Sequence, residues 1–314
     1  MLAAGFGAAP AHAQPYPEKP IKLIVPLVPG SPITALARVV AQPLSARLGQ
    51  QVIIENRPGA GTSIGVKAAA ALPPDGYNLL MYGQNIAYIQ MIYPDLGFDP
   101  LKTFVPVAPL AQFSHVFVIA PEIPAKTLKE FVAYAKASPG KLNFGFGLGT
   151  MPQIIGEYFN KVAGLDIVSV PYKGGEQVRV DLLGGRIQMN VGPPTNLMAL
   201  IRNGKLRPIA VTNKSRLKDL PDVPTMIESG YPQVGFHPDV WQGILAPVGT
   251  PREIVEKLNA EINAVLKMPD VRASLLRMGV DEPMTMSTAE FAVFVAGEDK
   301  KWPPIIKTIG LKAQ

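Results

Sequence analysis

Residues 22–55, KLIVPLVPGSPITALARVVAQPLSARLGQQVIIE, contain in succession a strand, a turn, a helix and a second strand. Residues 22–26 are a short apolar run of the kind found in buried strands, and residues 29–32 (PGSP) are a turn. Residues 33–48 place apolar side chains three and four positions apart, as an amphipathic helix requires. Residues 51–55 are again strand-like, so this stretch predicts one unit of a parallel sheet with helices on both faces.

The same alternation continues along most of the chain. Further strands are expected at 77–82, 142–146, 167–170, 187–191 and 206–211, and helices at 64–72, 128–137, 154–162, 178–183, 197–202, 252–266 and 271–277. Residues 93–106 interrupt the pattern with several prolines, and residues 107–119 and 240–246 are expected to be extended. Ser287, with Glu290 three residues later, predicts a capping box for a last helix. The expected fold class is α/β, with two lobes.

Composition excludes several classes of function. The 314 residues include no cysteine, which rules out disulfides, thiol catalysis and thiolate metal sites. Apart from His12 the histidines are His115 and His237, far apart in sequence, and no cluster of acids occurs, so we expect neither a metal nor another cofactor. Net charge is +6, but the densest basic stretch, residues 213–219, holds only three Lys or Arg. We therefore expect no nucleic-acid partner.

Residues 1–13 (MLAAGFGAAPAHA) are small and apolar and end in an A-x-A cleavage pattern. They predict the remnant of a signal peptide cleaved near Ala13, and hence a periplasmic protein; the alternative is a disordered alanine-rich tail. No apolar run approaches the length that a membrane-spanning helix needs.

One glycine motif is similar to that of hydrolases and another to that of nucleotide-binding proteins, but neither motif matches its pattern fully. Residues 61–65 (GTSIG) match the G-x-S-x-G pattern of hydrolases, which would make Ser63 the nucleophile. That motif requires the serine on a sharp turn directly after a strand, but residues 57–60 (RPGA) separate the strand from Ser63 here. Residues 145–149 (GFGLG) lack the spacing of a dinucleotide fingerprint. A serine hydrolase remains a weaker alternative, and nucleotide binding is not expected.

Three strand-to-helix loops share a chemistry suited to anions. They are residues 29–32, 147–150 and 172–175, each rich in glycine or hydroxyl groups at the start of a predicted helix. Unpaired backbone N–H groups at such a position favour a negatively charged ligand without any cationic side chain. The alternative is that the glycines only form tight turns between strand and helix, but three such loops together favour a carboxylate site.

Several motifs resemble one known family along nearly the whole chain. They include residues 55–61 (ENRPGAG), 73–77 (PPDGY), 170–174 (VPYKG), 181–185 (DLLGG) and 220–225 (LPDVPT). Together they resemble the tripartite tricarboxylate transporter receptors, the TctC or Bug family of extracytoplasmic binding proteins.

The resemblance implies a type II periplasmic binding fold whose two lobes close on a ligand. The first lobe is expected to comprise residues 14–118 and 238–314, and the second lobe is expected to comprise residues 119–237, with hinges near 115–119 and 236–241. The resemblance further implies a monomeric binding protein, not an enzyme, that delivers a small carboxylate to the large and small integral subunits of a membrane transporter.

The resemblance also implies a ligand site. Gly30, Ser31 and Thr34 would bind a carboxylate from the first lobe, and Gly149 and Thr150 from the second. With neighbouring loop residues added, the expected ligand contacts are Gly30, Ser31, Pro32, Thr34, Tyr82, Gln84, Asn85, Phe146, Gly149, Thr150, Tyr172, Pro193, Thr195, His237 and Asp239.

The chain departs from the family pattern at three loops. The first loop keeps only one of the usual three glycines and lacks the usual acid, Met151-Pro152 replaces a pair of serines, and residues 191–195 (VGPPT) replace a polar segment. Each change removes polar groups, and Tyr82 and Phe146 are expected at the edges of the cleft. We therefore favour an aromatic mono- or dicarboxylate, such as terephthalate, as the ligand. Aliphatic di- or tricarboxylates, or a ligand-sensing role in signalling, are the alternatives.

Overall fold

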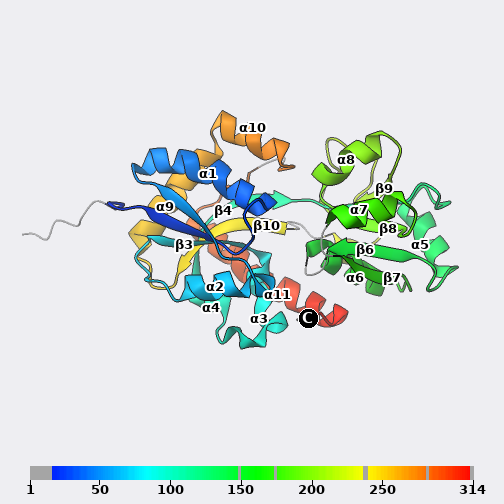
Figure 1. Ribbon diagram of the computed structural model, residues 1–314, viewed down its shortest axis with the longest axis horizontal. Coiled ribbons are helices and arrows are strands. Elements are labelled where there is room, and N and C mark those ends of the chain that lie inside the picture. Colours follow the sequence, from blue (N-terminus) through cyan, green and yellow to red (C-terminus); the bar gives the residue numbers. More distant parts are fainter. Residues whose placement is uncertain (1–15, 148–149, 173–174, 236–239, 281–282, 312–314) are drawn as a thin grey trace, which may run out of the picture.

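The computed structural model describes residues 16–147, 150–172, 175–235, 240–280 and 283–311. In Figure 1 these residues form two lobes, one built from both ends of the chain and the other from its middle, drawn in green. Within the described residues, each lobe contains one five-stranded sheet with helices packed against it. The α/β class and the two lobes expected from the sequence are confirmed.

The sheet of the first lobe has the order β2-β1-β3-β10-β4. Its strands are β1 (Ile21–Val25), β2 (Val52–Asn56), β3 (Asn78–Gly83), β4 (Phe104–Phe113) and β10 (Val240–Pro247). β1 runs parallel to β2 and β3, but β10 runs antiparallel to β3 and β4. The parallel unit predicted from residues 22–55 is confirmed by β1 and β2. β10, expected only to be extended, is antiparallel to its neighbours because it follows the second-lobe segment and runs back through the sheet.

The sheet of the second lobe has the order β7-β6-β8-β5-β9. Its strands are β5 (Val116–Ile119), β6 (Asn143–Gly147), β7 (Val168–Tyr172), β8 (Met189–Gly192) and β9 (Arg207–Val211). β6 is parallel to β7 and β8, whereas β5 is antiparallel to β8 and β9. β5 is the first strand after the chain leaves the first lobe, so its direction again reflects a crossing between lobes.

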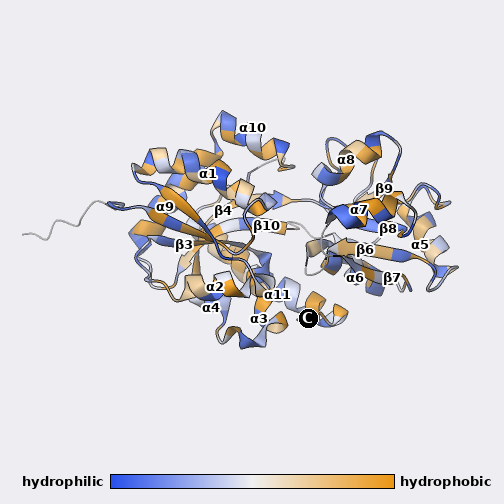
Figure 2. Cartoon of the chain, in the orientation of Figure 1, coloured by the Kyte–Doolittle hydropathy of each residue, from blue (hydrophilic) through white to orange (hydrophobic). Residues whose placement is uncertain are grey.

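Helices cover these sheets, and in Figure 2 hydrophobic and hydrophilic residues alternate along them. Their hydrophobic residues are largely buried, as Leu36, Val40 and Leu44 are in α1. The first lobe has α1 (Pro32–Leu48), α2 (Ser63–Ala70), α9 (Arg252–Leu266) and α10 (Pro269–Arg277). The second has α5 (Leu128–Lys136), α6 (Met151–Val162), α7 (Gly175–Leu183) and α8 (Pro194–Arg202). Gly156 allows α6 to pack closely on β6, because a Cβ there would collide with the ring of Phe144.

A series of short helical turns after β3 was missed by the sequence analysis. It comprises η2 (Gln84–Ala87), α3 (Ile89–Ile92), η3 (Pro94–Leu96) and α4 (Pro100–Thr103); η1 (Ala60–Thr62) and η4 (Pro232–Val234) lie elsewhere. Turns of three or four residues are too short to show a helical period, so no apolar repeat could reveal them.

The chain passes between the lobes at Ser114 and His115, between β4 and β5. Thr212 fixes this crossing, since its hydroxyl accepts the His115 N–H at 2.9 Å. Burial lowers the pKa of His115 to about 4, so its imidazole is neutral at neutral pH. The expected lobe boundary between residues 118 and 119 would divide β5, which pairs entirely within the second sheet. The boundary between 237 and 238 lies outside the described residues.

The last helix, α11 (Thr288–Ile309), joins both lobes. It begins with the predicted capping box of Ser287 and Glu290, which is confirmed. Its early residues Phe291 and Val295 pack in a first-lobe apolar cluster. Trp302, near its end, packs in the cluster that forms the core of the second lobe. Residues 238–314 were all expected to belong to the first lobe, but the end of α11 packs on the second lobe.

Candidate functional site

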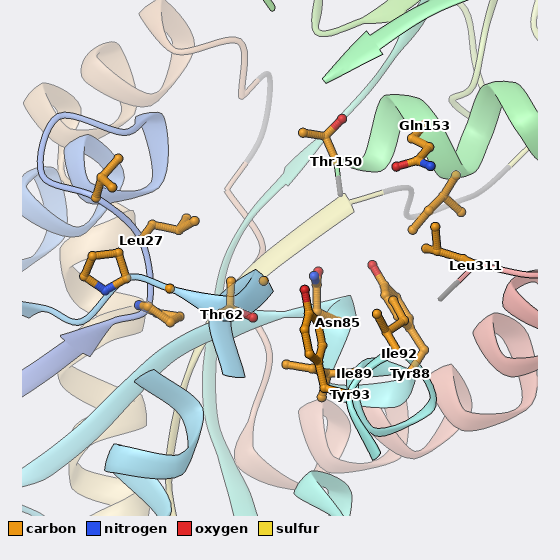
Figure 3. Close-up of a pocket in the computed structure, with 16 residues that line it drawn as sticks. Leu27, Thr62, Asn85, Tyr88, Ile89, Ile92, Tyr93, Thr150, Gln153 and Leu311 are labelled. Atoms are coloured by element: carbon orange, nitrogen blue, oxygen red, sulfur yellow. The ribbon is translucent and has the colours of Figure 1, made fainter. Parts of the chain in front are cut away.

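A cavity of about 410 Å³ lies between the two lobes. Figure 3 shows its walls, which come from the β1–α1 connection, from η1, from the turns after β3, from the start of α6 and from the chain just beyond α11. The lining residues are Pro26, Leu27, Val28, Pro58, Gly59, Gly61, Thr62, Asn85, Tyr88, Ile89, Ile92, Tyr93, Thr150, Gln153, Ile154 and Leu311.

One side of the cavity is formed by residues 85–93 (NIAYIQMIY), which we call the floor segment. The segment follows the end of β3 at Gly83, where a side chain does not fit because a Cβ would collide with the Trp241 carbonyl of β10. Figure 3 shows the Asn85 amide and the hydroxyls of Tyr88 and Tyr93 pointing from this segment toward α6. The floor segment therefore presents polar tips on a largely apolar surface.

Two side chains of the floor segment retain donors for a ligand. The Asn85 Oδ1 atom accepts a hydrogen bond from Gln84 Nε2 at 2.9 Å, and its Nδ2 group has no partner among the described residues. The Tyr93 hydroxyl lies against Gly61, where a Cβ would collide with the phenol, and it too lacks a partner in the described part of the chain. A carboxylate placed between them could accept hydrogen bonds from both.

Thr62 adds a third hydroxyl to the same wall. Its Oγ1 atom lies 2.8 Å from the hydroxyl of Tyr82, a buried residue at the end of β3. When Tyr82 donates this hydrogen bond, the Thr62 hydroxyl can donate to a ligand. Burial raises the pKa of Tyr82 above its ordinary value, so its proton remains available for this role.

The opposite wall is the start of α6. Thr150 occupies the N-cap position of this helix without a side-chain capping bond, and its hydroxyl donates to Gly147 O at 2.6 Å, away from the floor segment. The positive end of the helix dipole faces the cavity, since Thr150, Gln153 and Ile154 line it, although Pro152 contributes no N–H. Tyr88 spans the gap, because its hydroxyl donates to Met151 Sδ at 3.4 Å.

Charged side chains are absent from the lining residues named above, which include no Lys, Arg, His, Asp or Glu. Burial raises the pKa of Tyr88 well above its ordinary value, so it too is neutral. Within the described residues, no group of His, Asp and Glu could hold a metal ion. An anion in this cavity would thus be bound by neutral donors and by a helix start.

The first loop, expected to bind the ligand, uses its hydroxyls internally. Ser31 caps α1 by accepting the Thr34 N–H at 3.1 Å. The fully buried Thr34 hydroxyl donates to Val28 O at 3.2 Å and accepts from Asn56 Nδ2 at 2.9 Å. Gly30 and Pro32 are exposed and lie outside the cavity lining.

The remaining expected contacts are scattered. Phe146 is buried in the second-lobe core, 5.2 Å from the ring of Phe144, and the Tyr172 hydroxyl bonds Asp181 at 2.8 Å. Pro193 and Thr195 begin α8, with Thr195 beside Gly279 of the first lobe. Among the expected residues that the structure describes, only Asn85 and Thr150 line the cavity. Gln84 and Tyr82 are hydrogen-bonded to the lining residues Asn85 and Thr62, respectively. Gly149, His237 and Asp239 lie outside the described residues.

Sequence reasoning missed most of the aromatic and aliphatic lining, notably Tyr88, Ile89, Ile92, Tyr93 and Leu311. One signal was available for the first four. Tyrosines and isoleucines are concentrated in the floor segment directly after a predicted strand, at the edge of the sheet where ligands bind in α/β proteins. Leu311 had no such signal, because it reaches the cavity only through the path of α11.

Fold and cavity together are those of a two-lobed α/β protein with a cavity between its lobes. Residues 36–311 match the family described as "Tripartite tricarboxylate transporter family receptor". The chain is 34% identical to protein BugT of Bordetella pertussis, over 97% of this chain and 94% of BugT.

Two solved structures are similar over almost their whole length. The periplasmic binding protein BugD superposes with a TM-score of 0.78 at 29% identity, covering 95% of this chain and 100% of BugD. The R. palustris protein Rpa4515, solved with adipate, superposes with a TM-score of 0.79 at 31% identity, covering 94% of this chain and 98% of Rpa4515. The periplasmic binding fold expected from the sequence is confirmed.

The chain belongs to the tripartite tricarboxylate transporter receptor family. It is therefore a solute-binding receptor and not an enzyme, which removes the hydrolase alternative. The structure agrees, since Ser63 is buried as the first residue of α2 instead of standing exposed on a sharp turn. No helix within the described ranges is long and apolar enough to cross a membrane.

Proposed function

We propose that this chain is a periplasmic receptor that captures a small aromatic mono- or dicarboxylate, such as terephthalate, and delivers it to the large and small integral subunits of a tripartite transporter. One observation carries the proposal: the cavity combines an apolar, aromatic lining with neutral hydrogen-bond donors and contains no cationic side chain among its described lining residues.

The apolar part of the wall suits a flat ligand body. Ile89, Ile92, Ile154 and Leu311 offer aliphatic surface, and Tyr88 and Tyr93, labelled in Figure 3, add aromatic rings to the lining. An aromatic ring buries its faces against such side chains at about 25 cal/mol per Å² of apolar area. A short, highly charged acid such as citrate would leave this surface unused and would need more donors than the wall provides.

The polar part of the wall suits a carboxylate. Hydrogen bonds to a charged acceptor contribute about 1.5–3 kcal/mol each. Donors from Asn85, Tyr93 and Thr62, with the start of α6 opposite, could bind one carboxylate at the floor segment and leave the second end of a dicarboxylate near α6. After the cost of association, such a set corresponds to about −8 kcal/mol, or micromolar affinity.

An aliphatic dicarboxylate of moderate length is the second candidate. It is favoured by the similarity to Rpa4515, a protein solved with adipate. The methylene groups of a ligand of that kind could also cover the isoleucine surface of the cavity.

A thermal-denaturation panel separates the two candidates. Benzoate, terephthalate, adipate, succinate and citrate are each titrated, and a ligand present at about 100 times its Kd should stabilise the protein by about 2.7 kcal/mol. We expect the largest shift with an aromatic acid. A clear shift with adipate or citrate, and none with either aromatic acid, would contradict the aromatic assignment.

Export can be tested separately. Residues 1–13 are proposed to be removed near Ala13, so the amino-terminal sequence of protein recovered from the periplasm should begin at Gln14 or close to it. Recovery of uncleaved chain from the cytoplasm would contradict this part of the proposal.

A further inference from the structure

We propose that Gln84 is a positioning residue: it holds the amide of Asn85 so that the N–H groups, and not the carbonyl oxygen, face the ligand cavity. This inference rests on the proposed function, because it explains how the site selects a carboxylate over its neutral carboxamide analogue.

Gln84 stands directly behind the cavity wall. It is the first residue of η2, it is only 2% exposed, and it is not among the lining residues. Gly83, immediately before it, lies closely against the Trp241 carbonyl and the Gln242 side chain of β10. The backbone at this point is therefore confined, and the Gln84 side chain has little freedom to turn toward a ligand.

The bond from Gln84 to Asn85 has a direction. Gln84 Nε2 donates to Asn85 Oδ1 at 2.9 Å, which occupies the Asn85 oxygen and leaves Nδ2 for the cavity. If the Asn85 amide flipped end for end, two N–H groups would face each other and an oxygen would face the ligand. A carboxylate would then meet a like partial charge, whereas a carboxamide could donate to that oxygen.

The Gln84 oxygen has no comparable structural task. Its Oε1 atom is buried without a hydrogen-bond partner within the described residues. A buried acceptor of this kind costs free energy, so an apolar side chain of similar volume should be tolerated well. The Gln84 side chain therefore contributes more to the orientation of Asn85 than to the stability of the fold.

The test compares Gln84→Met with Gln188→Met. Gln188 is a structural glutamine of the second lobe, which accepts from Asn143 N and donates to Gly185 O. Benzoate and benzamide are the probes, and calorimetry gives their Kd values. For Gln84→Met we expect a Kd for benzoate about fivefold higher, an unchanged Kd for benzamide and an unchanged or higher Tm. For Gln188→Met we expect a lower Tm and unchanged Kd values.

A second readout needs no ligand. With asparagine selectively labelled with ¹⁵N, the Asn85 side-chain resonance, assigned by its loss in Asn85→Asp, should shift and broaden in Gln84→Met because the amide can now turn. If benzoate fails to bind the wild type but this resonance changes, the aromatic assignment fails and the positioning role stands. An unchanged resonance, or a benzoate-to-benzamide ratio that Gln84→Met leaves unaltered, would overturn the positioning role.

Discussion

Two connections leave the carboxyl edge of the first sheet from neighbouring strands, and they use their polar groups in opposite ways. After β1, the loop that leads into α1 binds its own backbone: Ser31 caps the helix and Thr34 bonds Val28. After β3, the floor segment leaves Asn85 Nδ2 and the Tyr93 hydroxyl without partners in the described part of the chain. The polar groups of the first connection are already hydrogen-bonded within the loop, whereas the second retains donors that could bind a ligand.

This difference shows why a hydroxyl-rich loop at a helix start is ambiguous evidence for binding. The same serine and threonine that could bind an anion can cap the helix instead, and a cap contributes about 1 kcal/mol to stability. Burial separates the two uses. Thr34 is fully buried, whereas Asn85 is half-buried at a cavity wall.

The largest expected effect comes from reversing the charge preference of the floor segment. Asn85→Asp replaces a donor with an anion beside the bound carboxylate, so the Kd for terephthalate should rise by about 100-fold or more. Calorimetric titration measures it. Asn196→Asp adds the same charge at an exposed position on α8 and should leave the Kd unchanged. Equal affinities for wild type and Asn85→Asp would place the ligand elsewhere.

Removal of one hydroxyl should have a smaller effect. Tyr93→Phe keeps the ring and deletes one charge-assisted hydrogen bond, which should raise the Kd about tenfold. Tyr134→Phe, on α5 of the second lobe, is the matched control and should bind as the wild type does. Should both variants bind equally well, Tyr93 does not donate to the ligand.

A substitution in the first loop should lower the stability of the protein and leave its affinity for the ligand nearly unchanged. Thr34→Val removes the hydrogen bonds to Val28 O and from Asn56, so the free energy of unfolding should fall by about 1–2 kcal/mol. Urea denaturation measures this, and the Kd should stay within about threefold of wild type. If Thr34→Val lost affinity for the ligand but kept its stability, the first loop and not the floor segment would bind the ligand.

The smallest effect is expected from pH. Because burial raises the pKa of Tyr88, its neutral form persists to higher pH than that of an ordinary tyrosine, and a phenolate that would repel the ligand does not form in the neutral range. Affinity should therefore change by less than about twofold between about pH 6 and about pH 9. Titrations across this range would reveal a steep loss if an ionising group of the wall contributed to binding.

Much of the fold could be predicted from the sequence because its helices and strands have clear periods. The helix predicted at 252–266 coincides with α9, and the capping box at Ser287 was predicted from two residues. The directions of β5 and β10 could not be predicted, because they depend on where the chain crosses between lobes. A local pattern contains no information about that.

The site was predicted less completely, for a physical reason. Resemblance and loop chemistry pointed to Ser31 and Thr34, whose hydroxyls turn out to bind the backbone of their own loop. Tyr88 and Tyr93 stand beside turns of three or four residues that have no period. Leu311 reaches the cavity through α11, which packs on both lobes.

In the proposed site, neutral donors of the floor segment bind the carboxylate. The most direct measurement is a crystal structure of the protein with the tightest-binding acid of the panel. We expect a carboxylate oxygen about 3 Å from Asn85 Nδ2 and from the Tyr93 hydroxyl, with the ligand body against Ile89 and Ile92. A carboxylate bound instead to Ser31 Oγ and Thr34 Oγ1, with no ligand atom at Asn85, would contradict it.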